Sequence, residues 1–232
     1  MRRLLRSSCR APVIADVRLR VDALLLDLDG TLLDDRAAVH VALSALLEAN
    51  GCSAPEFDAM DRWRSIASVH WSRFERGEVT FADQRRFRVR DFLGGRLSDA
   101  DADAAFEPYR LAYENAWRLF PECTRFFQLT ERLPKVVVTN GDKAQQMLKI
   151  KRTGIAAQIV TVITPEDCGA WKPDHRIFLA AITHLGLPHQ RCMMIGDDAE
   201  RDIRPARELG LQTFHIDRSE PANSLLDALD SI

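Results

Sequence analysis

The sequence predicts an α/β fold in which a parallel five-stranded sheet is interrupted by an all-helical insertion. Short apolar runs recur without polar alternation, which is typical of strands covered on both faces. Helical patterns separate the last four runs, as in a parallel sheet with right-handed crossovers. Between the first run and the second, residues 36–119 contain helical patterns and no strand-like run. At 232 residues, 46% of them hydrophobic, the chain can bury a sizeable core.

The individual elements follow from these patterns. Glycines 154, 186 and 210 come directly after the helical patterns, where C-terminal caps belong. The alternation of strands and helices indicates a Rossmann-like core. We expect strands at 21–26, 135–139, 159–163, 192–195 and 212–216, and core helices at 143–152, 174–185 and 203–209.

The helical insertion divides the chain into three parts. The chain leaves the core near Asp34 and returns near Pro121. We therefore predict a core made of residues 21–35 and 120–232, with the insertion at 36–119 between them. Residues 1–20 are rich in Arg and Ser and nearly free of acid, as in a transit peptide, but they lack the apolar segment of a secretory signal. The favoured interpretation is a disordered leader or an over-extended start.

Composition excludes several classes of partner. A net charge of −2 gives no reason to expect a nucleic acid polymer or a membrane surface. No apolar run approaches the roughly 20 residues of a membrane span. The cysteines form no CxxC pair, which favours free thiols and a cytoplasmic location; they stand at positions 9, 52, 123, 168 and 192.

Polar side chains gather at the predicted carboxyl ends of the strands. Asp27 and Asp29 follow the first strand, and "TNGD" (139–142) follows the second. "WKPD" (171–174) opens the helix after the third strand, and "GDDAERD" (196–202) follows the fourth. In open α/β sheets, ligands bind beyond these strand ends. The sequence therefore predicts one site built from segments that are far apart in the chain.

The residue types at this edge suit a phosphoryl group held with a divalent cation. Crowded carboxylates repel each other unless a cation lies among them, and hard oxygen ligands suit Mg²⁺. Lys172 can neutralise phosphate oxygens, while Thr139 and Asn140 can donate hydrogen bonds to them. Of the paired aspartates, one can act as a nucleophile that forms an aspartyl phosphate. The other can act as the general acid and base.

Two further residues are predicted to shape the turn that follows the first strand. Gly30 lets the chain turn at once after the strand, and the Thr31 hydroxyl can bind the carboxylates of the turn. Each motif alone has an ordinary structural explanation, such as a turn or a helix start. Their joint occurrence at four predicted strand ends favours a functional site.

The motifs "DLDGTL", "TN", "KP" and "GDDAERD" resemble, in order and spacing, the four motifs of the haloacid dehalogenase (HAD) superfamily. The resemblance covers residues 21 to 217 and is to the branch with a helical cap (subfamily I). Within it, the chain is most similar to pyrimidine nucleotidases and N-acylneuraminate-phosphate phosphatases. The resemblance implies that Asp27 is the nucleophile and Asp29 the general acid and base. Phosphate would be bound by Thr139 and Lys172.

The resemblance also implies the metal site. Mg²⁺ would be held by Asp27, Asp197 and the backbone carbonyl of Asp29. Asp202 would support the site from behind or through water. Asp198 departs from the pattern, because related proteins often have a small polar residue there. The choice of Asp197 over Asp198 rests on the spacing of the motif.

These observations predict an enzyme that hydrolyses small phosphate monoesters with Mg²⁺ through a phospho-aspartate. Its partner would be a small phosphorylated metabolite such as a nucleotide or sugar phosphate. A phosphomutase, a 2-haloacid dehalogenase and a receiver-like phospho-switch remain alternatives. Dehalogenases of this superfamily lack the second aspartate, so Asp29 favours phosphate chemistry. The natural substrate and the oligomeric state stay open.

Residues in the insertion are predicted mainly to pack. Aromatic residues at helical spacing favour packing over a pocket, and the basic run "RRFRVR" (85–90) favours a solvated helix face over an anion-binding surface. The residues considered for a substrate pocket are Trp63, His70, Trp71 and Arg73.

Overall fold

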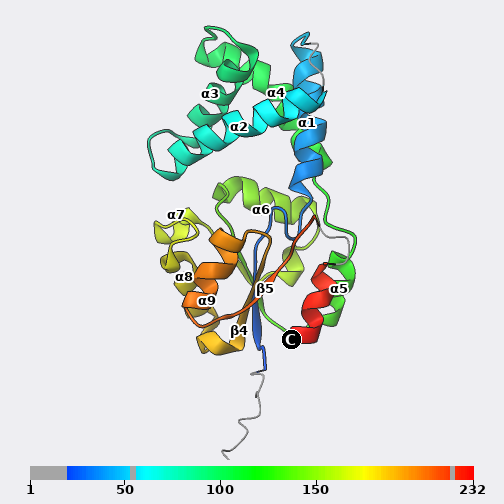
Figure 1. The fold of residues 1–232 in the computed structure, drawn as a ribbon, viewed down its shortest axis with the longest axis vertical. Coiled ribbons are helices and arrows are strands. Elements are labelled where there is room, and N and C mark those ends of the chain that lie inside the picture. The colour runs from blue at the N-terminus through cyan, green and yellow to red at the C-terminus, as the bar shows by residue number, and fades with distance from the viewer. Residues whose placement is uncertain (1–19, 53–55, 220–222) are drawn as a thin grey trace, which may run out of the picture.

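The core of the molecule is a parallel sheet whose strands follow the order β3-β2-β1-β4-β5 (Figure 1). The computed structural model describes residues 20–52, 56–219 and 223–232. The predicted α/β fold with a parallel five-stranded sheet is confirmed. Each strand lies within its predicted run, except that β4 continues to Gly196. The strands are β1 (Ala23–Leu26), β2 (Lys135–Val138), β3 (Thr161–Ile163), β4 (Cys192–Gly196) and β5 (Gln212–His215).

The central strand β1 is buried on both faces, as its unbroken apolar run predicts. Leu24 and Leu26 pack on one face with Phe126, while Leu25 packs on the other with Phe178. Successive side chains of a strand point to opposite faces, so both faces must be covered by helices. Burial of this run leaves the polar residues that follow it at the edge of the sheet.

Two core helices begin at aspartate caps. Asp142 and Asp174 each accept a hydrogen bond from a backbone N–H of the helix that follows. Asp174 is thus the cap and not the first helical residue. The helices are α5 (Cys123–Leu129), α6 (Lys143–Arg152), α7 (Pro165–Cys168), α8 (His175–Leu185) and α9 (Arg204–Glu208), with short turns η1 (Ala156–Gln158), η2 (His189–Arg191), η3 (Ala199–Ile203) and η4 (Leu225–Ser231).

Among the described residues between β1 and α5, four helices form a second body, called the cap below, which stands over the carboxyl ends of the strands (Figure 1). It has a hydrophobic cluster of its own, in which Trp63 of α2 meets Phe92 of α3 and Tyr109 of α4. Its helices are α1 (Asp35–Ala49), α2 (Glu56–Glu75), α3 (Phe81–Leu93) and α4 (Asp99–Ala116).

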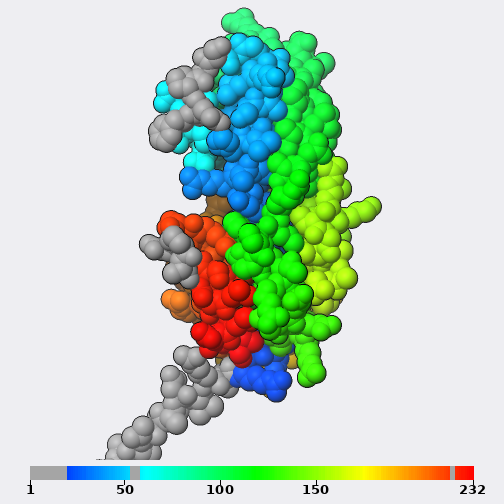
Figure 2. Space-filling model, turned by 90° about the vertical axis from the view of Figure 1, so that its right-hand side faces the viewer, coloured from blue at the N-terminus to red at the C-terminus, as the bar shows by residue number. Residues whose placement is uncertain are grey.

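The cap is joined to the core by two chain segments that pair with each other. The N–H of Asp34 donates to the carbonyl of Arg118 at 3.0 Å, and the N–H of Phe120 donates to that of Leu32 at 2.9 Å. Above this junction α1 and α4 lie against each other and connect the two bodies (Figure 2). Leu33 in the first of these segments also bridges to Asp29, so the linking segments adjoin the turn that follows β1.

Several predictions concern residues beyond the sheet and cap. The leader predicted at 1–20 lies outside the described residues except for Arg20, and Cys9 lies outside them as well. The other cysteines, at 52, 123, 168 and 192, are free thiols. Among the described helices, none is both long enough and apolar enough to cross a membrane.

Candidate active site

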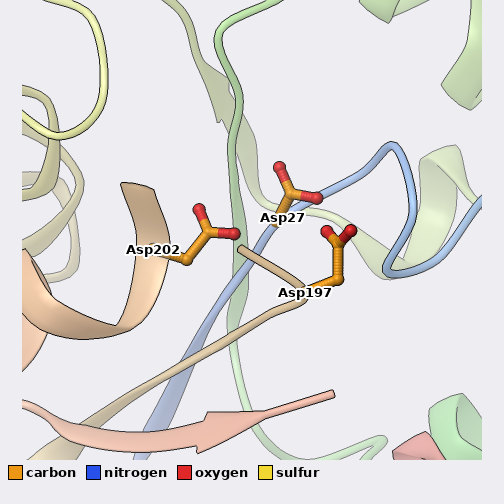
Figure 3. Close-up of side chains that lie close together, drawn as sticks. All are labelled: Asp27, Asp197 and Asp202. Carbon is orange, nitrogen blue, oxygen red and sulfur yellow. The ribbon is translucent and has the colours of Figure 1, made fainter. Parts of the chain in front are cut away.

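Three aspartates from two neighbouring strand ends converge above the sheet. Asp27 follows β1, Asp197 follows the adjacent β4, and Asp202 lies in η3. Each offers a carboxylate oxygen, and these oxygens lie within 4.8 Å of one another. Figure 3 shows the three carboxylates turned toward a common point. Because β1 and β4 are parallel neighbours, Asp27 and Asp197 meet although they lie 170 positions apart in the sequence.

Lys172 is the cation placed among these carboxylates. Its Nζ lies 2.6 Å from Asp27 Oδ1 and 2.6 Å from Asp202 Oδ1. Asn140 fixes the backbone of this lysine, because its Nδ2 donates to the Lys172 carbonyl at 2.9 Å and its Oδ1 accepts from the Lys172 N–H at 2.6 Å. Both ends of the Asn140 amide are engaged in this way. Its side chain therefore positions Lys172, and its predicted contact with phosphate stays a prediction.

The turn after β1 requires glycine because Asp197 packs against it. Gly30 has a φ of 87°, and a Cβ at this position would lie 2.4 Å from Asp197 Oδ2. The Thr31 hydroxyl donates to Asp197 Oδ1 at 3.1 Å, so the predicted contact of Thr31 is with the carboxylate of β4. Arg218 clamps the turn from outside by donating to the carbonyls of Gly30 and Thr31.

The electrostatics of the cluster favour a further cation. Burial raises the pKa of Asp27 well above its usual range, and the charges of Asp202 and Asp197 add to this, against the opposing effect of Lys172. Burial together with Asp202 also raises the pKa of Asp197. For Lys172, burial acts to lower the pKa, but the carboxylates of Asp202 and Asp27 raise it above its usual value. One ammonium therefore faces three carboxylates in a desolvated space.

One carboxylate oxygen in this cluster has no partner. Asp27 Oδ2 is buried and accepts no hydrogen bond, although a buried charged oxygen without a partner is costly. The two oxygens of Asp202, in contrast, accept from Lys172 and from the N–H of Asp198. A hard cation bound to Asp27 and Asp197 would satisfy the free oxygen and offset the like charges. The donor set therefore fits Mg²⁺.

Asp198 and Thr139 have separate places in the same region. The Asp198 carboxylate caps η3 by accepting from the N–H groups of Glu200 and Arg201, each at 2.9 Å. Asp197, and not Asp198, therefore belongs to the carboxylate cluster. Thr139 is 3% exposed and lines the same cleft as Asp27. Its hydroxyl oxygen accepts from the Gly141 N–H at 3.2 Å, so the hydroxyl hydrogen remains available to a ligand.

Asp29 turns away from the cluster toward α6. Its carboxylate accepts from Lys149 Nζ at 2.6 and 2.7 Å and from Gln146 Nε2 at 3.0 Å. The motif analysis missed both α6 residues. Their signal was their position, since Gln146 and Lys149 fall on the buried face of the helix together with Ile150. Polar residues on a face that should be apolar indicate a partner across the interface.

A cleft of about 740 Å³ connects these residues to the cap. This volume is within the range of small-molecule sites. Trp63 and Trp71 of α2 line it, whereas His70 and Arg73 do not. His70 instead pairs with Asp91 of α3 at 2.6 Å, which joins two cap helices. Of the four residues considered for a pocket, the structure places the two tryptophans on the cleft.

The end of α2 closes one side of this cleft against the core. Trp71 and Phe74 form edge-on contacts with Trp171, which immediately precedes Lys172. Glu75 pairs with Arg201 of η3 at 3.2 Å. Both contacts join the cap to loops that carry site residues. These contacts link the end of α2 to the segments that contain Lys172 and Asp202.

The sequence matches the haloacid dehalogenase-like hydrolase family over residues 21–210. The chain belongs to this family. A phosphoserine phosphatase of Thermus thermophilus is 29% identical over 222 residues, covering 84% of this chain and 88% of that protein. The predicted membership in the HAD superfamily is thereby confirmed, and the chain is a hydrolase.

Two solved structures have a fold similar to that of this chain. The HAD-hydrolase YfnB of Bacillus subtilis, described as bound to magnesium and as showing interdomain movement, has a TM-score of 0.74 and 25% identity, covering 85% of this chain and 89% of that one. The L-2-haloacid dehalogenase PA0810 has a TM-score of 0.69 at 23% identity, covering 88% of each chain. The second likeness concerns the fold alone. A phosphatase and a dehalogenase are thus both similar to this chain. The fold does not distinguish ester hydrolysis from carbon–halogen cleavage, so the site residues must.

Proposed function

We propose that this protein is a Mg²⁺-dependent phosphatase that hydrolyses small phosphate monoesters through an aspartyl phosphate on Asp27. The unpartnered buried oxygen of Asp27, beside Asp197 and Lys172 at the base of the cleft, carries this proposal. An acyl phosphate forms when one carboxylate oxygen of Asp27 attacks phosphorus, while the other carboxylate oxygen can bind the cation. The likeness to a phosphoserine phosphatase supports the same chemistry.

The reaction would divide into two steps. An oxygen of Asp27 attacks phosphorus, the ester P–O bond breaks, and Asp29 gives its proton to the departing alkoxide. Asp29 then takes a proton from water, which attacks the phosphorus of the aspartyl phosphate. The Asp27–phosphorus bond breaks, and inorganic phosphate leaves. The Thr139 hydroxyl and the Lys172 ammonium hold phosphoryl oxygens throughout, because phosphoryl transfer depends mainly on positioning and charge stabilisation.

The metal would be held by Asp27, Asp197 and the backbone carbonyl of Asp29. When bound, Mg²⁺ supplies positive charge that draws the phosphoryl oxygens and the nucleophile together. Thr31 keeps Asp197 turned toward this position, and Asp202 keeps Lys172 there. Asp198 acts on the backbone of η3 and takes no part in the metal site.

Asp29 favours phosphate esters over carbon–halogen bonds. A halide leaves without a proton, so a dehalogenase needs no second acid at this place. Here Asp29 lines the cleft and is held by two α6 side chains. Asp29 faces α6 in the structure, so its carboxylate would turn toward the leaving group to transfer the proton. Small metabolites such as sugar phosphates or nucleotides fit a cleft of about 740 Å³. We also propose a cytoplasmic location for the enzyme.

The test is a steady-state assay of the full chain with para-nitrophenyl phosphate and a panel of metabolite phosphates. We expect many turnovers with Mg²⁺, none in EDTA, and recovery when Mg²⁺ is restored. Phosphorylation that stops at one equivalent would indicate a phospho-switch. Isomerised phosphate esters without free phosphate would indicate a mutase. Release of halide from 2-haloacids without ester hydrolysis would indicate a dehalogenase.

A further inference from the structure

The basic run on α3 divides between two faces of the helix. Arg86 and Arg90 point outward and form ion pairs within the cap: Arg86 lies 2.7 Å from Asp103, and Arg90 lies 2.5 Å from Asp99. Both side chains are only partly exposed, and carboxylates of the cap neutralise them. Arg85 and Arg88 lie on the other side and line the cleft that contains Asp27. The two pairs of arginines therefore have different surroundings.

Neither cleft arginine has a carboxylate partner among the described residues. The Arg85 guanidinium lies 4.1 Å from the ring centre of Phe81, and that of Arg88 lies 4.5 Å from the ring centre of Trp63. Arg88 also approaches the hydroxyl of Tyr109, but its Nε is buried without a hydrogen-bond partner. Burial lowers the pKa of Arg85, despite the opposing charge of Asp142. Burial therefore affects Arg85 most, and neither guanidinium forms an ion pair within the described residues.

A third polar group on the same face is also unsatisfied. Gln84, one turn before Arg88, is 1% exposed, and its Oε1 has no hydrogen-bond partner. It lines the cleft together with the two arginines. Buried polar groups in native proteins are rarely left without partners, and unpaired buried cations are costly. A ligand in the cleft would supply what these groups lack.

The chemistry of that ligand follows from the donors. Two guanidiniums present planar forks of N–H donors, which match the oxygens of a carboxylate or a phosphate. An aromatic base is a poor fit here, because the guanidiniums already cover the Phe81 and Trp63 rings. The neighbouring Arg110 is unavailable, since it pairs with Glu107 and Glu114.

We propose that Arg85 and Arg88, with Gln84, form a subsite for a second anionic group, so that the preferred substrates carry a carboxylate or a second phosphate besides the transferred phosphoryl. This inference rests on the proposed phosphatase function. The phosphoryl group lies at Asp27 and Lys172 on the core side, and the second anion lies on α3 across the cleft. Gln84 Oε1 accepts a hydrogen bond from a hydroxyl or amine beside that anion.

The test compares pairs of phosphate esters that differ in one anionic group, with Mg²⁺ present. Suitable pairs are phosphoglycolate and ethyl phosphate, 3-phosphoglycerate and glycerol 3-phosphate, and fructose 1,6-bisphosphate and fructose 6-phosphate. For at least one pair, we expect the anionic member to have the higher kcat/KM by about 10- to 100-fold. The pair that responds distinguishes a carboxylate from a second phosphate.

Variants on α3 then locate the effect. Arg88→Met should bring the ratio of kcat/KM within the responding pair close to one, and Arg85→Met should reduce it. Arg86→Met is the matched control, because this arginine lies on the same helix but outside the cleft, and it should preserve the ratio. Ratios near one for every pair, or a ratio that survives in both Arg85→Met and Arg88→Met, would overturn the subsite. Arg88→Lys retains the charge without the fork, and we expect an intermediate ratio.

A binding measurement separates this inference from the proposed function. Calorimetry with the Asp27→Asn protein and Mg²⁺ compares the affinity of the two members of each pair without turnover. We expect the anionic member to bind more tightly, and the difference to vanish in the Asp27→Asn/Arg88→Met protein. If the wild-type chain hydrolyses no ester, the phosphatase proposal fails, and this measurement still decides the subsite. Equal affinities within every pair would refute it.

Discussion

The ammonium of Lys149 lies 2.6 and 2.7 Å from the two carboxylate oxygens of Asp29. Lys149 is 1% exposed, and its Nζ is also 3.7 Å from Asp35, the first residue of the first cap helix. Burial acts to lower the pKa of Lys149, but the charges of Asp29 and Asp35 outweigh it and raise the pKa above its usual value. Lys149 is thus a buried, charged residue that links Asp29, the candidate general acid and base, to Asp35 at the start of the cap.

Removal of this ammonium should impair the proton-transfer steps. In Lys149→Met, Asp29 loses two charged contacts, and we expect kcat/KM toward alkyl phosphates, which reports the phosphorylating step, to fall by about 10- to 100-fold, because small misplacements of a catalytic group are costly. The loss should be smaller for para-nitrophenyl phosphate, whose leaving group needs no proton. Steady-state kinetics with both ester types measures this difference.

Lys151→Met is the control for this prediction. Lys151 lies on the same helix but is exposed, so its loss should leave both rates near those of the wild type. Thermal unfolding of each variant shows whether α6 remains folded. An equal loss for both ester types in Lys149→Met would indicate that Lys149 does not act through Asp29.

The sequence could place the strand-end residues because their positions depend only on local patterns. The apolar run of β1 fixes where Asp27 leaves the sheet, and the same holds for Thr139 after β2 and Asp197 after β4. A parallel sheet brings all carboxyl ends to one edge, so no side-chain contact had to be known. These features make the α/β core and the site region accessible to sequence reasoning.

Contacts between elements were not accessible in the same way. The pairing of Asp29 with Lys149 depends on how α6 rotates against the turn after β1, and no local pattern encodes that rotation. Asn140 could equally have faced a ligand, and its reciprocal bonds with Lys172 depend on the path of the loop after β3. Which of the α3 arginines line the cleft depends on how α3 packs against α2. Tertiary packing, and not propensity, decides each of these.

Two adjacent aspartates should differ in their effect on Mg²⁺ affinity. Asp197 belongs to the carboxylate cluster, whereas Asp198 caps η3. Asp197→Asn removes a charge from the cluster, and we expect Mg²⁺ affinity to fall about tenfold or more. Asp198→Asn retains an oxygen that can cap the helix, so affinity should stay close to that of the wild type. Calorimetric titration with Mg²⁺ measures both, and the reverse order would show that Asp198 is the ligand.

The contact between cap and core should contribute to substrate binding. Glu75 of α2 pairs with Arg201 of η3 across the two bodies. In Glu75→Gln we expect KM to rise about two- to fivefold, the usual worth of a partly exposed ion pair. The difference should shrink at high salt, which screens such pairs. Glu78→Gln serves as the control, because Glu78 pairs with Arg73 and Arg76 within the cap. Equal KM values for both variants would show that this contact does not hold the cap closed.

The two aspartates that follow β1 should fail in different ways. Asp27 supplies the carboxylate that attacks phosphorus, so Asp27→Asn should abolish turnover and form no phosphorylated protein. In Asp29→Asn, para-nitrophenyl phosphate can still phosphorylate Asp27, because its leaving group departs without a proton. Hydrolysis of the aspartyl phosphate should then be slower by about 10²- to 10⁴-fold, the usual worth of general acid and base catalysis.

Rapid-quench and intact-mass measurements distinguish these outcomes. A phosphorylated protein should accumulate in Asp29→Asn with para-nitrophenyl phosphate, and much more slowly with an alkyl phosphate, whose alkoxide needs the missing proton. Asp27→Asn provides the control, since it should gain no mass with either ester. The contrast follows from position, because Asp27 lies among Asp197, Asp202 and Lys172, while Asp29 faces α6. If neither variant gains phosphate and both lose activity equally toward every leaving group, the two carboxylates do not divide the work in this way.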